Sequence, residues 1–152
     1  MIVNMRIQMY INHTTKEFIE KARIARLATV DSRSQPHLVP VVFVFDDNYF
    51  YLPIDEKRKT VKPEKLKRII NIKKNPHVAL LIDEYSEDWT RLAFVIIHGK
   101  ASIVSQLRED TWPQEAYKKL MTKYPQYQKI KLSEMYIIIK PEKVSSWQNS
   151  HA

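Results

Sequence analysis

The sequence predicts an α+β fold in which helices flank a mostly antiparallel β-barrel of six strands. Six segments have the length and the β-branched or aromatic content of strands, and three have the apolar periodicity of helices. These segments do not alternate as regular strand–helix–strand units, which argues against a parallel sheet. The 152 residues, of which 44% are hydrophobic and 28% charged, suit a globular protein. Because no linker or repeat divides the chain, we expect a single domain over residues 1–152.

The first predicted elements are a short helix and a strand with small side chains. Thr14 or Thr15 is expected to cap a helix that ends near Ala22. Strand residues 24–30 follow, and the polar residues 31–35 form a turn. The small side chains of this strand would let a flat group approach the backbone.

A long apolar run from Pro36 to Phe45 is expected to form a strand that is buried on nearly both faces. Pro40 lies inside this run and has no N–H to donate. It therefore places the run at a sheet edge, at a bulge, or beside something other than a neighbouring strand. The polar residues 46–48 then predict a hairpin between this run and a strand over residues 49–52.

The second half of the chain is expected to supply two helices and three strands. A helix from Pro63 to Lys74 has its basic residues, Arg68 included, on the solvent side. The single glycine, Gly99, lies where a bulge or a tight barrel corner requires one. The other predicted elements are strands over residues 77–83, 92–104 and 135–139 and a helix over residues 110–124.

The composition excludes several kinds of site. With no cysteine, the chain has no disulfide, thiolate metal site or cysteine nucleophile. With one glycine, it has neither the dinucleotide-binding glycine motif nor a P-loop, so side chains must hold any phosphate. The histidines lack the short spacings of metal ligands, and we expect no metal site; they are His13, His37, His77, His98 and His151.

The positive charge is concentrated in one segment. The chain carries a net charge of +8, and residues 56–74 hold nine Lys or Arg against two Glu. Such a patch, with the aromatic residues 49–51, leaves open an RNA- or single-strand-binding barrel as the less favoured alternative. No apolar run is long enough to cross a bilayer, and residues 1–6 lack the order of a secretion signal, so we expect a cytoplasmic protein.

Short motifs follow one another in a specific order between Arg26 and Val104. They are Leu27-Ala28-Thr29-Val30-Asp31, Gln35-Pro36-His37, Val39-Pro40-Val41, Phe50-Tyr51, Asp55-Glu56-Lys57-Arg58-Lys59, Asn71-Ile72 and Asn75-Pro76-His77-Val78-Ala79-Leu80-Leu81. In this order they resemble the pyridoxamine 5'-phosphate oxidase-like, FMN-binding split-barrel family. Residues 83–92, followed by His98-Gly99-Lys100-Ala101, are similar to a branch of that family, the deazaflavin-dependent oxidoreductases.

The resemblance implies a split barrel that forms a homodimer, with a cofactor at the interface between the subunits. The implied cofactor is FMN or, alternatively, the deazaflavin coenzyme F-420. The positions that match the family's motifs are Val39, Pro40, Val41, Tyr51 and Leu52 for the ring and chain, Lys57 and Lys59 for the phosphate, and Trp89 and Arg91 for a loop near the cofactor or substrate. The chain departs from the family by lacking glycine in the turn at residues 31–35 and by carrying Arg58 where proline is frequent.

Each of these side chains also has an ordinary structural interpretation. Tyr51 and Trp89 suit stacking on a ring, but aromatic side chains more often pack in a core. Arg91 suits an anionic substrate or a reduced ring, and it equally suits an ion pair with Glu87 or Asp88. A lysine-rich stretch is often only solvated surface, and the family resemblance is what favours phosphate binding by Lys57 and Lys59.

The function that we expect is therefore that of a flavin- or deazaflavin-dependent oxidoreductase. The cofactor carries the hydride chemistry, and the protein binds and orients it. The sequence shows no side-chain nucleophile and no paired carboxylates, so it identifies no catalytic residue. A carrier or sensor on the same fold, which binds the cofactor without turnover, is the first alternative.

Overall fold

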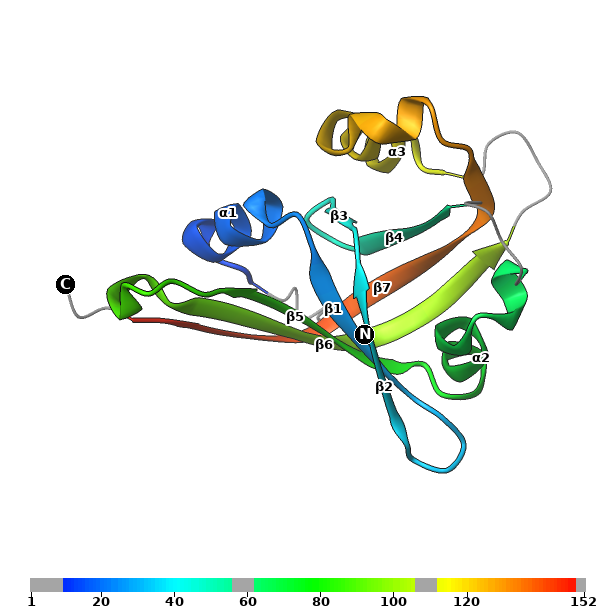
Figure 1. Cartoon of the computed structure of the whole chain (residues 1–152), viewed down its shortest axis with the longest axis horizontal. Helices are drawn as coiled ribbons and strands as arrows, with labels where there is room; N and C mark the ends of the chain where they lie inside the picture. Colours follow the sequence, from blue (N-terminus) through cyan, green and yellow to red (C-terminus); the bar gives the residue numbers. More distant parts are fainter. Residues whose placement is uncertain (1–9, 56–61, 106–111, 150–152) are drawn as a thin grey trace, which may run out of the picture.

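The computed structural model describes residues 10–55, 62–105 and 112–149 as one curved antiparallel sheet with helices around it (Figure 1). The helices are α1 (His13–Lys21), α2 (Lys67–Lys74) and α3 (Gln114–Lys123), together with short 3-10 turns at Pro63–Lys65, Trp89–Arg91 and Pro125–Gln128. The strands are β1 (Ala25–Val30), β2 (Pro36–Val41), β3 (Val44–Phe45), β4 (Phe50–Asp55), β5 (His77–Glu84), β6 (Ala93–Ser105) and β7 (Leu132–Gln148).

The sheet confirms the predicted α+β split barrel, with one strand more than expected. The order of the strands is β2-β1-β5-β6-β7-β4-β3, and all neighbouring strands pair antiparallel. The sheet does not close, because β2 and β3 are its two ends. The seventh strand arises because the apolar run over residues 36–45 is divided between β2 and β3. The predicted hairpin is present, and β3 pairs with β4.

Strand β2 corrects the expectation of a strand buried on nearly both faces. It is one of the two edge strands, and its residues alternate between exposed and half-buried. Leu38 is 65% exposed, whereas the sequence predicted it to be buried. Pro40 lies opposite Arg26 on β1, and its missing N–H is harmless because only one side of β2 is paired. Of the three positions left open for Pro40, the sheet edge is the one observed.

Two groups of buried side chains hold the sheet and helices together. The larger group lies inside the barrel, where Leu27, Leu80 and Ile97 have no exposed surface. It includes three phenylalanines near the β3–β4 hairpin, Phe43, Phe45 and Phe50. The smaller group lies between α3 and the strands β3, β4 and β7, and it contains Tyr51, Leu120, Tyr124 and Tyr136. The helix α3 is thus fixed to one end of the sheet.

The local signals for helices and bulges are mostly confirmed. Helix α1 begins after Asn12, whose Oδ1 accepts a hydrogen bond from the N–H of Thr15 at 2.8 Å, so the cap is Asn12 and not a threonine. Gly99 lies at a shift in the β6–β7 register between His98 and Gly99, as a bulge requires. In the described part of the chain, no helix has the length and apolar composition needed to cross a membrane.

Candidate functional site

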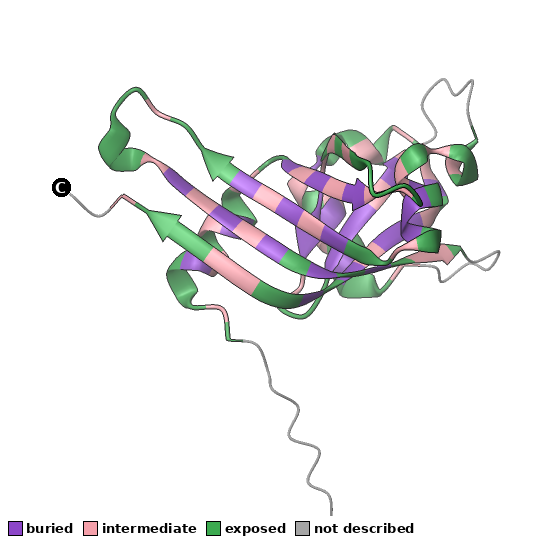
Figure 2. Ribbon diagram, turned by 90° about the horizontal axis from the view of Figure 1, so that it is seen from below, coloured by how far each residue is buried: buried purple, intermediate pink, exposed green. Residues whose placement is uncertain are grey.

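The face of the sheet that points away from the core is half-exposed and largely apolar. Residues that lie directly opposite one another on neighbouring strands point to the same face. Figure 2 shows buried and less buried residues alternating along the long strands, as expected for a sheet with one covered face. We call the less buried side the outer face; it contains Arg26, Ala28, Leu38, Pro40, Ala79, Leu81, Phe94, Ile96, His98 and Trp147.

Two alanines lie side by side near the middle of the outer face. Ala28 on β1 lies opposite Ala79 on β5, and both are half-buried. In the same row, Leu38 on β2 lies opposite Ala28, and His98 on β6 lies opposite Ala79. Two methyl side chains between two larger ones form a shallow floor against which a planar ring can lie close to the backbone.

The rest of the outer face carries both an apolar cluster and separated charges. The rings of Phe94 and Trp147 stack with their centroids 5.7 Å apart. Beside them, Arg26 Nη1 lies 2.6 Å from Asp83 Oδ1 in an ion pair whose side chains are 42% and 39% exposed. The other end of the face carries four exposed basic or histidine side chains, with the exposed Glu142 beside them at the bulge; the four are His77, His98, Lys100 and Lys143.

A partly buried arginine of α2 lies within electrostatic range of the last residue of β4. Burial lowers the pKa of Arg68, and the carboxylate of Asp55 opposes this shift. Arg68 is therefore not the ordinary surface residue of α2 that the sequence predicted. Lys57 and Lys59, which follow Asp55 in the chain, lie outside the described residues. Arg68 is a cation that sequence reasoning missed at this corner of the sheet, since helical periodicity gives no signal for its proximity to β4.

Tyr51 and Leu52 have their side chains in the core. Tyr51 is 3% exposed, and its hydroxyl donates a hydrogen bond to Asp46 Oδ2 at 3.0 Å. Burial, with the nearby Asp46 carboxylate, raises the pKa of Tyr51 well above its usual value. Its ring packs near Trp112 and Tyr136. Of the two roles that the sequence left open for Tyr51, the structure therefore shows packing in the core. A contact between this strand and a cofactor stays a prediction.

The segment 39–41 divides between the two sides of the sheet. Val39 and Val41 pack against the core, whereas Pro40 is exposed on the outer face beside Arg26. Of these three residues, Pro40 is the one whose ring is available on the outer face. Its role in holding a cofactor was predicted from the family motif and remains a prediction.

Trp89 and Arg91 lie at the tip of the β5–β6 hairpin, at the opposite end of the sheet from α2 (Figure 1). Trp89 is 66% exposed, and its carbonyl accepts a hydrogen bond from Asn149 Nδ2 at 2.7 Å. Arg91 Nη2 lies 3.9 Å from Glu84 Oε1, a partner that differs from the two expected acidic residues. Within one chain the structure does not bring this tip to Arg68.

Across the described ranges, no three potential metal ligands of the types His, Cys, Asp and Glu lie close enough together to hold a metal ion.

The comparisons with known proteins agree with this architecture. The family model described as "Pyridoxamine 5'-phosphate oxidase" matches residues 11–148. The structure is similar to that of the heme storage protein HutZ of Vibrio cholerae, with a TM-score of 0.67, 18% identity, and coverage of 92% of this chain and 95% of that one. No curated protein sequence matches the chain.

Two further solved structures show the same fold. A conserved hypothetical protein of Mycobacterium tuberculosis has a TM-score of 0.68 and 19% identity, with 95% of this chain and 89% of that chain covered. An FAD-binding protein of Mesorhizobium loti has a TM-score of 0.62 and 19% identity, with 88% and 89% covered. At these identities the likeness concerns the fold alone.

Proposed function

Because the chain belongs to the pyridoxamine 5'-phosphate oxidase family, we propose that it is a flavin- or deazaflavin-dependent oxidoreductase that acts on a small molecule. The family match over residues 11–148 carries this proposal. A flavin or deazaflavin supplies the hydride transfer when it is bound. The protein's part is to hold the phosphate, to support the ring and to exclude water from it. The likeness to an FAD-binding protein supports the same cofactor class.

The residues present fit such a cofactor. Arg68 of α2 is a partly desolvated guanidinium within electrostatic range of Asp55, the last residue of β4. Lys57 and Lys59 follow Asp55 in the sequence. Guanidinium and ammonium groups are the donors that bind phosphate oxygens without a glycine-rich loop. The alanine floor of the outer face suits a planar ring. We therefore assign phosphate binding to Lys57, Lys59 and Arg68, and ring contact to Ala28, Ala79 and Pro40.

We further propose that a second copy of the chain covers the outer face, which gives a homodimer. An apolar sheet face with Leu38, Phe94 and Trp147 partly exposed suits a subunit interface. The two ends of this face differ in charge, because Asp83 at one end is paired with Arg26 whereas Lys100 and Lys143 lie at the other. A two-fold axis that runs across the strands would bring each end onto the opposite end of the partner. In such a dimer, Trp89 and Arg91 of the hairpin tip would reach the cofactor of the other subunit.

A variant of the basic segment tests the phosphate assignment. Lys57→Ala with Lys59→Ala is expected to weaken flavin binding at least about tenfold, because one charge-assisted hydrogen bond contributes about 1.5–3 kcal/mol. The measurement is a fluorescence titration of apoprotein with FMN. The control is Lys73→Ala with Lys74→Ala, which removes the same charge from an exposed end of α2. A folded double variant at Lys57 and Lys59 that binds with parental affinity would contradict the assignment.

A single charge on the outer face tests the dimer. Leu38→Asp is expected to weaken self-association at least about thirtyfold, since burying an unpaired carboxylate at an interface costs 2 kcal/mol or more. Sedimentation equilibrium gives the dissociation constant. Tyr117→Asp is the matched control, because Tyr117 is 45% exposed on α3, away from the outer face. Equal dissociation constants for the two variants would show that another surface forms the interface.

The second candidate function is that of a cofactor carrier without turnover. The likeness to a heme storage protein favours it, since that protein has the same fold. Bound cofactor that never cycles with any reductant or acceptor would support a carrier. The nucleic-acid alternative loses much of its predicted stacking platform, because Phe50 and Tyr51 are buried and Tyr49 alone of the three is exposed.

A further inference from the structure

An open cavity of about 370 Å³ lies between α1, β3 and α3. Its floor is apolar, formed by Val44 and Phe45, and Glu20 of α1 stands on one wall. The other wall is formed by α3, and we call the space the α1–α3 cavity. Its lining residues belong neither to the outer face nor to residues 56–74. It is therefore separate from the proposed flavin site.

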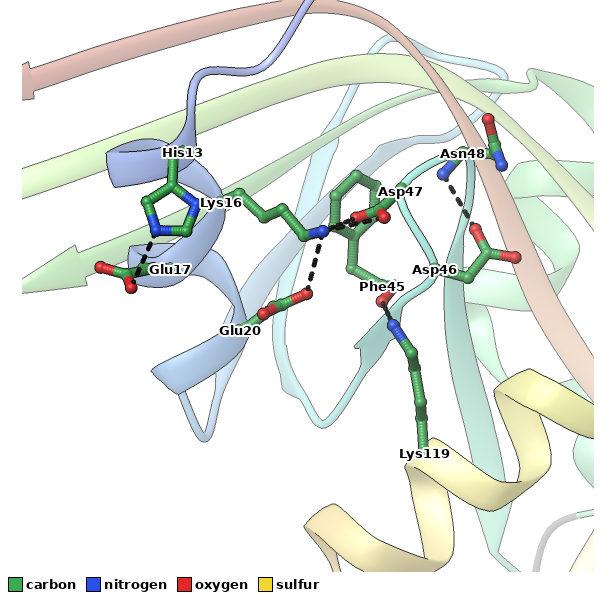
Figure 3. Close-up of polar contacts among 9 residues, drawn as sticks. All are labelled: His13, Lys16, Glu17, Glu20, Phe45, Asp46, Asp47, Asn48 and Lys119. Atoms are coloured by element: carbon green, nitrogen blue, oxygen red, sulfur yellow. Dashed lines mark hydrogen bonds and ion pairs between the residues drawn. The ribbon is translucent and has the colours of Figure 1, made fainter.

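Two lysines of α3 point into this region from the same side of the helix. Lys119 Nζ donates a hydrogen bond to the carbonyl of Phe45 at 3.1 Å, as Figure 3 shows, and Lys123 Nζ donates one to the carbonyl of Phe43 at 3.1 Å. Phe45 is in β3, which is an end strand of the sheet, and Phe43 immediately precedes β3, so the two lysines cover this sheet edge. An ammonium group has three donors, and each of these bonds uses one.

Neither ammonium group has a carboxylate partner among the residues that the structure describes. The nearest carboxylates of the neighbouring elements are engaged elsewhere. Lys16 Nζ lies 2.7 Å from Asp47 Oδ1 and 3.9 Å from Glu20 Oε1, and Figure 3 shows Lys16 between them. Lys119 and Lys123 thus have no ion-pair partner among these residues, whereas Lys118 of the same wall lies 4.0 Å from Glu115 and Glu20 faces the cavity from α1.

The ammonium group of Lys123 is partly buried beside an aromatic ring and a second cation. Its Nζ lies 3.9 Å from the centroid of the Phe43 ring. Burial lowers the pKa of Lys123 to about 8, Arg23 contributes in the same direction, and Glu20 opposes it. Arg23 itself donates a hydrogen bond to the carbonyl of Lys123 and lies over the Tyr124 ring. A partly desolvated ammonium beside a second cation is a group that an anion would stabilise.

We propose that the α1–α3 cavity binds a small anion with an apolar part, a phosphate monoester or a carboxylate, between Lys119 and Lys123. The anionic oxygens accept the remaining donors of the two ammonium groups, and the apolar part lies on Val44 and Phe45. The hydroxyl of Thr122, which also lines the cavity, supplies a further donor. The structural role of the lysines at the sheet edge persists in this complex, because each keeps its bond to a carbonyl.

Binding of the anion is linked to the protonation of Lys123. The charged and titratable groups around it are Arg23 and Glu20, which precede β1, and Lys118, Lys119 and Tyr124 of α3 and its end, whereas Asp47 of the β3–β4 turn pairs with Lys16. The anion favours the ammonium form, so it raises the pKa of Lys123. The free protein loses that proton as the pH rises through the pKa of about 8, and the apparent affinity is expected to fall toward tenfold per pH unit above it.

Phenyl phosphate is the probe, because it stays a dianion over this pH range and has one ring. Calorimetric titration at pH 7.5 is expected to show saturable binding that Lys119→Gln and Lys123→Gln each weaken about tenfold or more. Lys21→Gln, which removes the same charge from the exposed end of α1, is expected to leave the affinity within about twofold. Lys123→Gln also removes the fall in affinity above pH 8.

The same titration separates this site from the flavin phosphate site. The variant Lys57→Ala with Lys59→Ala is expected to keep its affinity for phenyl phosphate. Loss of binding in that variant alone would overturn the proposal, as would a parental protein that binds no phenyl phosphate at millimolar concentration. If Lys123→Gln does not fold, Lys119→Gln and the pH dependence of the parental protein decide the question.

Discussion

Replacing Phe50 with alanine is expected to lower the free energy of unfolding by about 3–5 kcal/mol. Phe50 begins β4 and has no exposed surface. Its ring stacks on Phe45 with centroids 4.4 Å apart and lies 5.9 Å from the Phe43 ring. Removing it leaves a cavity where β3 and β4 meet the core, and a packed interior closes such a cavity only in part.

Urea unfolding followed by circular dichroism, at one protein concentration for all variants, measures this loss. The matched control is Tyr49→Ala, which removes an exposed ring from the adjacent position and is expected to cost less than about 1 kcal/mol. A Phe50→Ala protein as stable as the Tyr49→Ala protein would show that the β3–β4 hairpin is not packed as described.

Gly99→Ala is expected to cost about 3 kcal/mol, the upper end of the usual range for overpacking. A Cβ at position 99 would lie 2.4 Å from the carbonyl oxygen of Lys140 and 3.1 Å from Ile139 Cγ2. The oxygen belongs to the backbone of β7, so the two longest strands would have to separate at the bulge. Because the φ of Gly99 is not positive, its backbone conformation does not require glycine. The close approach of the Lys140 carbonyl does.

The same unfolding experiment tests this prediction, with Lys100→Ala as its control. Lys100 is the exposed neighbour on β6, and its truncation is expected to change the stability by less than about 0.5 kcal/mol. If Gly99→Ala were equally neutral, β6 and β7 would not approach each other as closely at the bulge as the structure shows.

The sequence predicted three helices and six strands, but it did not predict that the run over residues 36–45 is divided between the two end strands of the sheet. Alternating patterns and turn residues predict β1, β5 and β6 directly. The run that contains Leu38 was expected to be buried because its residues are apolar. An apolar side chain that a second subunit would cover has the same chemistry as one covered by its own chain. The sequence pattern therefore cannot separate these two cases.

Family motifs name candidate site positions in the sequence, but they do not show which of those side chains the fold brings together. Tyr51 carries the same ring whether it packs against Trp112 or against a cofactor, so its residue type does not decide between the two. Arg68 lies within electrostatic range of Asp55 because α2 packs against β1 and β6, an arrangement that no local pattern encodes. Trp89 and Arg91 are far from α2 because the β5–β6 hairpin is long.

Binding of a flavin-type cofactor by this protein is tested most directly by one visible absorption spectrum. The visible absorption of freshly purified protein is recorded, then recorded again after addition of FMN and of the deazaflavin cofactor, with unbound ligand removed each time. We expect one of the two to remain bound, with its ring absorption shifted from that of the free cofactor. Retention of neither would contradict the proposed oxidoreductase, and phenyl phosphate binding at the α1–α3 cavity would still be testable on its own.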